Sequence, residues 1–408
     1  MLVSDYSYEL PEDRIAKYPP KERGSTRLLV LNREDGIVKD SFYRDLADFL
    51  NPGDVLILND TRVMQSRLFM TLPDGREREL IVLEKHASNS QRVMYRGKLH
   101  VGDILKLNPL KIKHNSPFNR EEEKDNDGLE NHVEELESHV NDPHSRHKEA
   151  TQEALAHDSY ERAADTPRLG TDRTRTNYAT EAAQDVEVKV TKILGNGIAE
   201  VESGVDLVEL AESFGTVPLP PYLHRDAEIS DQLRYQTVWA KSLGSAAAPT
   251  ASLNMTAELL DKLKQKGVVI KYLTLHVGLG TFLPIRSDEV EGHKMHSEWF
   301  NIPDDTIDAI KAAKQTGARV VALGTTVART LEYYAKTNQT SGEDDIFIYP
   351  GFEFRLIDAL LTNFHAPKST VLMLAAAFAG WENLKMAYDH AIQNGYNFLS
   401  YGDSMLIC

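Results

Sequence analysis

"PDDTIDAIKAAKQTGARVVALGTTVARTLEYYAK" spans residues 303–336 and decides the fold class, because it places a strand between two helices. The first segment is expected to form a helix that Gly317 ends, since glycine readily takes the left-handed conformation that follows a helix. The run "ARVVALG" is then predicted to be a strand and "VARTLEYYAK" a second helix. Such alternation is typical of an α/β layer architecture.

The same alternation continues on both sides of this stretch. Upstream, Thr256 is suited to cap the helix "AELLDKLKQK", and "VVIKYLTLHV" alternates as a strand does. Downstream, the helix "NLKMAYDHAIQ" leads into "YNFLSYGDSMLI". The early strands "TRLLVLNR" and "GDVLILND" have the same buried character. The N-terminal residues are therefore expected to join the sheet of the C-terminal half.

Short alternating segments between these halves predict a small antiparallel β domain over residues 66–216. The α/β domain would then be discontinuous, with residues 1–65 and 217–408 on either side of the inserted domain. Residues 120–185 carry 18 acidic and 8 basic residues and few large apolar ones. Because such a segment buries too little surface to offset its ordering entropy, residues 116–184 are predicted to be a disordered insertion.

Composition bounds the class of protein. A length of 408 residues is about two to three usual domains, and 41% hydrophobic residues indicate a globular chain. The longest apolar run, residues 371–381, is shorter than the roughly 20 residues that span a bilayer, so a soluble, cytoplasmic protein without a membrane partner is expected. Cys408 is the only cysteine, which excludes an intrachain disulfide and a cysteine-based metal site.

Several polar clusters follow predicted strands, where ligands collect in α/β sheets. Residues 324–326, "GTT", suit a carboxylate or a ribose, or a simple threonine cap of the next helix. "HVGLGTF", residues 276–282, contains two glycines that let the backbone approach a ligand closely or merely form a turn. Residues 361–370, "LTNFHAPKST", bring an amide, an imidazole, an ammonium and two hydroxyls to one junction between a strand and a helix.

Other clusters leave alternatives open. "HKMHSE", residues 293–298, could be a zinc site without a visible third ligand, a substrate-facing acid-base group, or surface histidines. "SAAAPTASLN", residues 245–254, leaves room for a flat ligand or forms a tight packing corner. "RYQTVWA", residues 234–240, offers a cation beside an aromatic ring or an ordinary helix. "NDTRV", residues 59–63, supplies either a structural ion pair or a site at the end of a strand.

The order of these segments resembles one family. The matching blocks are "YELPEDRIAKYPPKERGSTRLLVLNR", "PGDVLILNDTRVMQSRLF", "VPLPPYLHR", "RYQTVWA", "AAAPTASLN", "LHVGLGTFLPI", "HKMHSEWF", "LGTTVARTLE", "LLTNFHAPKST" and "SYGDSMLI". Together they resemble the S-adenosylmethionine:tRNA ribosyltransferase-isomerases of queuosine biosynthesis over nearly all of the chain outside residues 114–185. The resemblance implies a large mixed α/β domain interrupted by a small antiparallel β-barrel-like domain. The acidic insertion in that domain is not part of the family pattern.

The resemblance also implies the reaction. The ribosyl part of S-adenosylmethionine would move onto 7-aminomethyl-7-deazaguanine at the wobble position of a tRNA with a GUN anticodon. Ring rearrangement would give epoxyqueuosine, while adenine and methionine leave. S-adenosylmethionine is then the ribosyl donor, no metal or redox cofactor is expected, and the enzyme is expected to be a monomer. A base near ribose C5′ and an acid near adenine would assist these steps.

Site residues follow from the matching blocks. Candidate acids and bases are His296, Glu298, His365 and Asp403. Candidate substrate-binding residues are Asp60, Arg62, Gln236, Pro249, Thr250, Gly278, Gly280, Thr281, Phe282, Thr325, Thr326, Asn363, Lys368, Ser369 and Tyr401. Lys368 would meet the methionine carboxylate or a tRNA phosphate, and Ser369 or Thr370 would cap the following helix.

A tRNA surface is predicted on the β domain, at Arg92, Arg96 and Lys98. The formal charge of −16 opposes nucleic-acid binding, but residues 120–185 contribute −10 of it, so only −6 remains elsewhere. A local basic path is compatible with that smaller charge. Such a surface would recognise the shape of the tRNA loop and the modified base more than the sequence of a duplex.

Three positions of one block depart from the family. Where its members carry "PTAGLHF", this chain has "PTASLNM", so Ser252, Asn254 and Met255 replace glycine, histidine and phenylalanine. Asparagine forms hydrogen bonds but exchanges no proton near neutral pH. This substitution leaves open a catalytically impaired RNA-binding homologue. Another S-adenosylmethionine-dependent tRNA-modifying enzyme, such as a methyltransferase, is a further alternative, although no strand, Gly-rich loop and helix unit typical of one occurs near the N-terminus.

Overall fold

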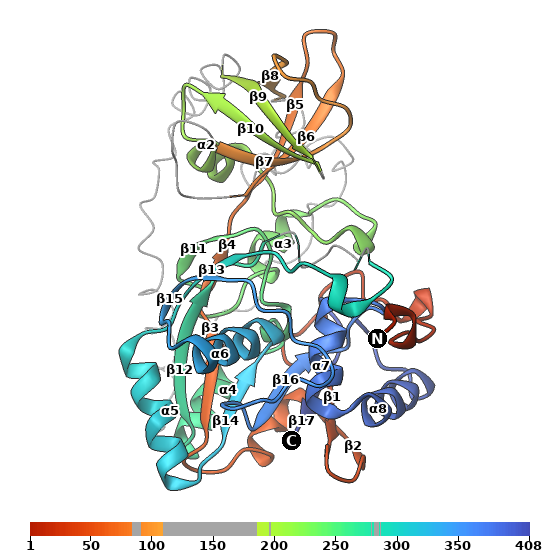
Figure 1. The fold of residues 1–408 in the computed structure, drawn as a ribbon, viewed down its shortest axis with the longest axis vertical. Helices are drawn as coiled ribbons and strands as arrows, with labels where there is room; N and C mark the ends of the chain where they lie inside the picture. Colours follow the sequence, from red (N-terminus) through yellow and green to blue (C-terminus); the bar gives the residue numbers. More distant parts are fainter. Residues whose placement is uncertain (84–90, 109–185, 196, 279, 281–284, 286) are drawn as a thin grey trace, which may run out of the picture. The chain divides into compact units, whose positions relative to one another are not determined.

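The computed structural model describes residues 1–83, 91–108, 186–195, 197–278, 280, 285 and 287–408, all within one compact unit (Figure 1). The insertion predicted for residues 116–184 lies outside the described residues. In the described part of the chain, no helix has the length and apolar character needed to cross a membrane.

Residues 303–336 form the predicted helix, strand and helix, and their strand lies inside a nine-stranded mixed sheet. The order of strands is β15-β13-β12-β3-β14-β16-β17-β1-β2. Their bounds are β1 Arg27–Leu31, β2 Val38–Phe42, β3 Val55–Asn59, β12 Val269–Leu275, β13 Glu298–Asn301, β14 Val320–Leu323, β15 Ser341–Asp344, β16 Ala359–Asn363 and β17 Ser404–Ile407. The central strands β12, β3, β14 and β16 are parallel, so their carboxyl ends meet at one edge of the sheet.

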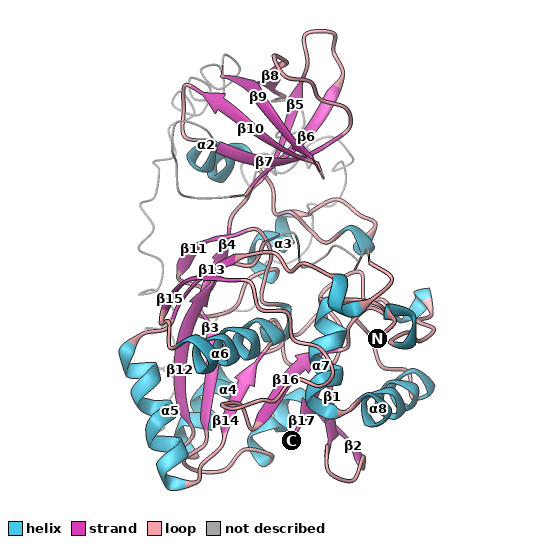
Figure 2. Cartoon of the chain, in the orientation of Figure 1, coloured by secondary structure: helices cyan, strands magenta, loops and turns pink. Residues whose placement is uncertain are grey.

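Helices cover both faces of this sheet (Figure 2). Apolar residues of α5 Asp304–Thr316, α6 Thr325–Thr337, α7 Thr370–Ala379 and α8 Trp381–Gln393 pack on one face. The helix α4 Ala257–Gln265 and the short helix η3 Tyr43–Asp48 pack on the other. In β14, Val320 and Ala322 join the first core while Val321 and Leu323 join the second. This alternation explains why the strand reads as a continuous apolar run.

Six antiparallel strands form a closed barrel in the order β10-β7-β6-β5-β8-β9. Their bounds are β5 Arg67–Thr71, β6 Glu77–Val82, β7 Gln91–Arg96, β8 Ile104–Leu107, β9 Glu187–Gly195 and β10 Ile198–Ser203. Alternate side chains such as Leu68 and Met70 are buried, as the period of two in the sequence predicts. The helix α2 Leu207–Phe214 contacts β5 and β6.

The predicted fold class, a mixed α/β domain with an antiparallel barrel, is confirmed. The N-terminal strands join the C-terminal sheet as expected, because β1 pairs with β17 and β3 lies between β12 and β14. Thr256 caps α4 and Ser369 caps α7, each accepting a hydrogen bond from a first-turn amide. The division into residues 1–65 with 217–408 and residues 66–216 stays a prediction. The strands β4 Thr61–Val63 and β11 Ser242–Ser245 form a small parallel pair, and β4 lies close to the predicted boundary at residue 65.

Candidate functional site

A cavity of about 170 Å³ lies at the carboxyl ends of β14 and β16. Three chain segments far apart in the sequence supply most of its wall, with single residues from elsewhere. The lining residues are Tyr222, Ala248, Pro249, Thr250, Ala251, Val277, Gly324, Thr325, Thr326, Thr362, Asn363, Phe364, His365, Ala366, Pro367, Lys368, Ser369, Val371 and Leu399. Eight predicted site residues are among them: Pro249, Thr250, Thr325, Thr326, Asn363, His365, Lys368 and Ser369.

The N-terminus of α6 forms one side of this cavity. Its N-cap is Gly324, which has a φ of +96° and makes no side-chain cap, so the alternative of a threonine cap is wrong. The following residues, Thr325 and Thr326, therefore present first-turn amides toward the cavity without a capping side chain of their own. Unsatisfied amides and the helix dipole favour an anionic or oxygen-rich group at this end.

Asn363 ends β16 and is 2% exposed. Its Nδ2 donates a long hydrogen bond of 3.5 Å to the carbonyl of Asp403. Its Oδ1 has no hydrogen-bond partner among the described residues. A buried acceptor without a partner costs free energy, on the order of 1–3 kcal/mol. Asn363 therefore lines the cavity with a side chain whose amide oxygen is buried and has no partner among the described residues.

His365 follows two residues later, and its backbone is held on both sides. Its amide donates to the hydroxyl of Tyr388 at 2.9 Å, and its carbonyl accepts from the hydroxyl of Tyr8. The ring is half-buried, with Nε2 2.9 Å from Oγ1 of Thr362. Burial lowers the pKa of His365 to about 3, so the imidazole is neutral near pH 7. A neutral imidazole can accept a proton or a hydrogen bond, but it has no proton to donate as an imidazolium general acid.

Lys368 lies in the turn after His365, and its side chain is exposed. Lys368 has a φ of +58° and donates its amide to the carbonyl of Tyr6 at 3.2 Å. The hydroxyl of Ser369 accepts from the amide of Leu372 and donates to the carbonyl of Ala366. The strand-to-helix loop predicted for this segment therefore exists, and the helix cap occupies the Ser369 hydroxyl.

Glu298 lies outside the lining of this cavity. It is buried at the start of β13, and Oε1 accepts the amide of Gly278 at 2.7 Å. Oε2 forms an ion pair with Arg329 of α6, whose Nε also lies 3.2 Å from Oδ2 of Asp344. Desolvation raises the pKa of Asp344, although Arg329 opposes this shift. The network links the loop after β12 to the helix whose N-terminus borders the cavity.

The two histidines of residues 293–298 lie in the loop before β13. His296 is exposed and packs on Gly280, where a Cβ would lie only 2.2 Å from Cδ2 of the ring. Glycine at that position therefore allows the ring to approach. Desolvation lowers the pKa of His293. Within the described ranges, no group of three or more histidine, cysteine or acidic side chains is arranged to hold a metal ion.

The C-terminal candidates also lie away from the cavity lining. The carboxylate of Asp403 accepts the amides of Arg27 at 2.6 Å and Asn397 at 2.7 Å, and burial raises its pKa. The hydroxyl of Tyr401 donates to Oδ1 of Asp231 at 2.8 Å. Both side chains thus hold the segment before β17 in place.

Three more predicted residues form contacts between segments. Oδ1 of Asp60 accepts from the hydroxyl of Thr274 at 2.6 Å, and Arg62 lies 3.2 Å from Glu212. The side chain of Gln236 exchanges two hydrogen bonds with the backbone of Val63. Thr281 and Phe282 lie outside the described residues.

Asn254, which stands where the family has histidine, is buried. Its Nδ2 donates to the carbonyl of Gly402 at 2.9 Å and lies 3.2 Å from the hydroxyl of Ser404. In this chain the residue anchors the C-terminal segment and does not line the cavity.

The basic residues predicted for tRNA are exposed on the barrel. Arg92 and Arg96 share the outward face of β7, and Lys98 follows the strand. Oε2 of Glu79 lies 3.7 Å from Arg96, and Glu200 is the cross-strand neighbour of Arg92.

Sequence reasoning missed Tyr222, Thr362 and Leu399 in the cavity wall, because nothing chemical distinguishes them before folding. Leu399 has a φ of +68°, which the sequence does not predict because leucine rarely adopts a positive φ.

The chain is similar to proteins of one family over its full length. Residues 3–141 and 142–407 match the family described as "Queuosine biosynthesis protein". A protein of Pelodictyon phaeoclathratiforme is 46% identical over the full length of both chains, and one of Sulfurihydrogenibium sp. is 39% identical, again over both full lengths. Both are named S-adenosylmethionine:tRNA ribosyltransferase-isomerase. The crystal structure of an S-adenosylmethionine tRNA ribosyltransferase from Thermotoga maritima is 26% identical, with a TM-score of 0.48 over 99% of this chain and 100% of that one.

Proposed function

The chain belongs to the queuosine biosynthesis protein family, and we infer from this membership that it is a transferase, acting as an S-adenosylmethionine:tRNA ribosyltransferase-isomerase. The relatives match across the whole chain, which includes every segment that supplies the cavity wall. S-adenosylmethionine is then the ribosyl donor and tRNA the acceptor. The acceptor base that we propose is 7-aminomethyl-7-deazaguanine at the wobble position of a GUN anticodon, with epoxyqueuosine, adenine and methionine as products.

S-adenosylmethionine is proposed to bind at the cavity beside β14 and β16. The observation that carries this assignment is that Asn363 lines the cavity and that its buried Oδ1 has no partner among the described residues. Adenine has an exocyclic amine that would donate to this oxygen once the side chain turns to expose it. At about 170 Å³ the cavity is smaller than the roughly 300 Å³ of a typical ligand pocket, so it suits one part of the molecule, such as the purine.

The polar groups around the cavity suit the rest of the donor. The N-terminus of α6 and the ammonium of Lys368 favour the methionine carboxylate, because both are positive and both residues border the cavity. The positive sulfonium makes the ribose C5′ hydrogens acidic. His365 is the proposed proton acceptor there because its ring lies in the wall, although a pKa of about 3 makes it a weak base.

The remaining candidates are proposed to position these groups. Glu298 would fix α6 through Arg329, and Asp403 would fix the segment next to Asn363. His296 stays a candidate at the loop that carries Gly280. This scheme requires no metal or redox cofactor, and we propose that the enzyme acts as a cytoplasmic monomer.

Adenine release tests the activity. Purified protein would be mixed with S-adenosylmethionine and tRNA bearing the precursor base, and the products separated by chromatography. Adenine supports the proposal, whereas S-adenosylhomocysteine indicates a methyltransferase. Absence of both products, with tRNA still bound, indicates an RNA-binding homologue.

The contact between adenine and Asn363 has a sharper test. An S-adenosylmethionine analogue with hypoxanthine in place of adenine carries a carbonyl where the amine donor was. Wild-type protein should bind it about 10- to 100-fold more weakly than S-adenosylmethionine, because two acceptors then face each other. Asn363→Ala should bind the two ligands with similar affinity. Equal preference in wild type and variant would contradict the assignment.

A further inference from the structure

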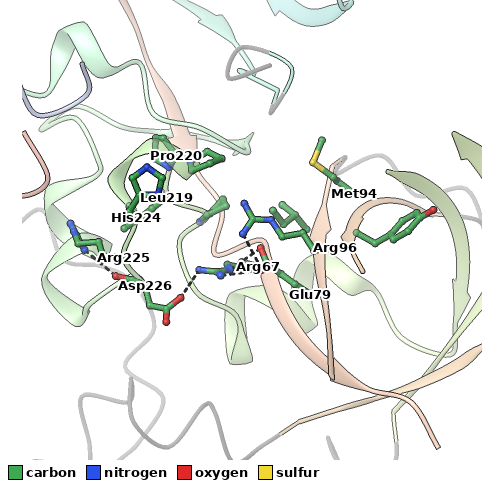
Figure 3. Close-up of a pocket in the computed structure, with 13 residues that line it drawn as sticks. Arg67, Glu79, Met94, Arg96, Leu219, Pro220, His224, Arg225 and Asp226 are labelled. Atoms are coloured by element: carbon green, nitrogen blue, oxygen red, sulfur yellow. Dashed lines mark hydrogen bonds and ion pairs between the residues drawn. The ribbon is translucent and has the colours of Figure 1, made fainter. Parts of the chain in front are cut away.

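A second cavity, of about 370 Å³, lies between the barrel strands β5 to β7 and the segment 218–226 (Figure 3). Its lining residues are Arg67, Glu79, Ile81, Met94, Tyr95, Arg96, Pro218, Leu219, Pro220, Pro221, His224, Arg225 and Asp226. It shares no lining residue with the first cavity. Hydrogen bonds between Arg67 and Thr216 at 2.9 and 3.1 Å attach this segment to β5.

Two of the three arginines that line this cavity form ion pairs with carboxylates. Arg67 lies between Glu79, with contacts at 2.9 and 3.0 Å, and Asp226 at 3.3 Å (Figure 3). Arg225 forms a bidentate pair with the buried Asp231 at 2.7 and 2.8 Å. These pairs shape the floor and rim of the cavity, and their charges are largely compensated.

Arg96 differs from both. Its side chain is 59% exposed, and Oε2 of Glu79 lies 3.7 Å from its guanidinium, beyond hydrogen-bond distance. The same carboxylate is already bound to Arg67. Arg96 is therefore a cation at the edge of the cavity that can turn toward an anion, and a guanidinium suits phosphate oxygens in particular.

The rest of the cavity wall is mostly apolar and aromatic. Ile81, Met94 and Leu219 supply apolar side chains, and the prolines between residues 218 and 221 supply rigid apolar faces. Proline has no amide N–H, so this side presents flat surface in place of hydrogen-bond donors. His224, in the left-handed conformation with a φ of +49°, adds an aromatic ring. Such walls suit a planar base, because unstacked bases bind by stacking on apolar and aromatic side chains.

We propose that this cavity receives one unstacked nucleotide of the tRNA, with its base against Met94 and the proline segment and its phosphate on Arg96. The proposal rests on the tRNA substrate of the proposed function. It is supported by the position of Arg92 on the same face of β7, because Arg92 and Arg96 are roughly 13 Å apart along an extended strand. A row of cations of that length follows a polynucleotide backbone and exceeds what a single free nucleotide needs. The cavity is separate from the one assigned to S-adenosylmethionine, so it would hold a neighbour of the reacting nucleotide and not the reacting base itself.

The test measures tRNA binding at several salt concentrations for variants of the full chain. Arg96→Ala should weaken binding about 5- to 10-fold and lower the slope of log K against log salt by about 0.7 to 1. Leu219→Trp fills the cavity without changing charge and should weaken binding roughly 5- to 100-fold with an unchanged slope. Met94→Ala, which removes part of the wall, should act in the same direction as Leu219→Trp.

Two controls make the result specific. Lys106→Ala removes one exposed positive charge from β8 of the same barrel, outside the cavity, and should leave tRNA affinity near wild type. S-adenosylmethionine affinity should be unchanged in every variant, which also shows that the variants are folded. Loss of affinity in Arg96→Ala with wild-type binding in Leu219→Trp and Met94→Ala would overturn the nucleotide pocket, because only a phosphate contact would remain.

The two proposals fail in different ways. Wild-type protein that releases adenine, while all three cavity variants bind tRNA as wild type does, overturns the pocket and leaves the proposed function standing. Wild-type protein that binds tRNA with the expected losses in the variants, but releases no adenine, overturns the proposed activity and supports the pocket.

Discussion

Nε2 of His365 lies 2.9 Å from the hydroxyl of Thr362. The ring thus has a neutral hydroxyl partner at the wall of the cavity, and its burial lowers its pKa to about 3. We expect the imidazole resonances of His365 to show no titration between pH 5 and 9. NMR of histidine-labelled protein checks this, with His365→Gln to identify the signal among the 14 histidines. A midpoint near 6.5 would contradict the neutral ring.

His365→Ala should reduce adenine release by about 100-fold or more, because a positioned proton acceptor contributes a factor of that order. Adenine release under saturating substrates is the measurement. His390→Ala is the matched control, since His390 lies at the surface beside Asp40 at 3.0 Å and does not line the cavity. If His365→Ala releases adenine at the wild-type rate, the residue is only part of the wall.

Arg329→Met should lower the free energy of unfolding by about 3–5 kcal/mol, because Glu298 and Asp344 would then be buried without their cation. Denaturant unfolding measures this loss. Desolvation raises the pKa of Asp344 and Arg329 opposes this, so without Arg329 the folded protein should hold a proton on Asp344 at higher pH than the unfolded chain does. The deficit should therefore shrink as pH falls from 7 to 5.

The control for Arg329→Met is Lys385→Ala, which removes an exposed pair with Asp389 at 2.8 Å. Its effect on the free energy of unfolding should stay below about 1 kcal/mol. A deficit in Arg329→Met that is equally small, or that grows at low pH, would contradict the role assigned to the buried network.

Asn254→Ala should destabilise the protein by about 1–3 kcal/mol, since the carbonyl of Gly402 loses a buried donor. Asn254→His, which restores the family residue, should leave the pH dependence of adenine release unchanged, because position 254 does not line the cavity. Thermal unfolding and a pH–rate profile measure the two effects. A new ionisation in the profile of Asn254→His would show that this position takes part in proton transfer.

Gly324→Ala should destabilise the protein by about 1–3 kcal/mol, because the φ of +96° is strained for any residue with a Cβ. It should also weaken S-adenosylmethionine binding, since the N-terminus of α6 would shift. Gly204→Ala is the matched control, because a Cβ there meets no atom within 4 Å and the backbone has no positive φ. Calorimetric titration and thermal unfolding distinguish the two variants. Equal behaviour of both would contradict the role of the α6 N-terminus.

Much of the fold could be predicted because it depends on short-range patterns. The continuous apolar runs of β14 and β16 and the caps at Thr256 and Ser369 act within a few residues, so the sequence displays them. The rule that ligands gather at the carboxyl ends of parallel strands also selected Thr325, Asn363 and His365, which do line one cavity.

Other features of the site depend on contacts across hundreds of residues. Glu298 and Asp403 resemble catalytic carboxylates in the sequence, yet Arg329 and two backbone amides occupy their oxygens. Tyr222 and Leu399 resemble ordinary core residues, yet they complete the cavity wall. No local pattern distinguishes a free carboxylate from one that pairs with a distant residue, as Glu298 does with Arg329 and Asp403 with Arg27.

By itself, the sequence determined the fold class, the family and the strand ends that carry reactive side chains, because periodicity and motif order are properties of the chain. Only the tertiary structure decided which polar groups remain available to a ligand. Burial and long-range hydrogen bonds satisfy Asp403, Glu298 and Asn254, while they leave Oδ1 of Asn363 unpartnered within the described residues and Arg96 largely exposed. That distinction arises from desolvation and pairing in three dimensions, which the order of residues alone does not display.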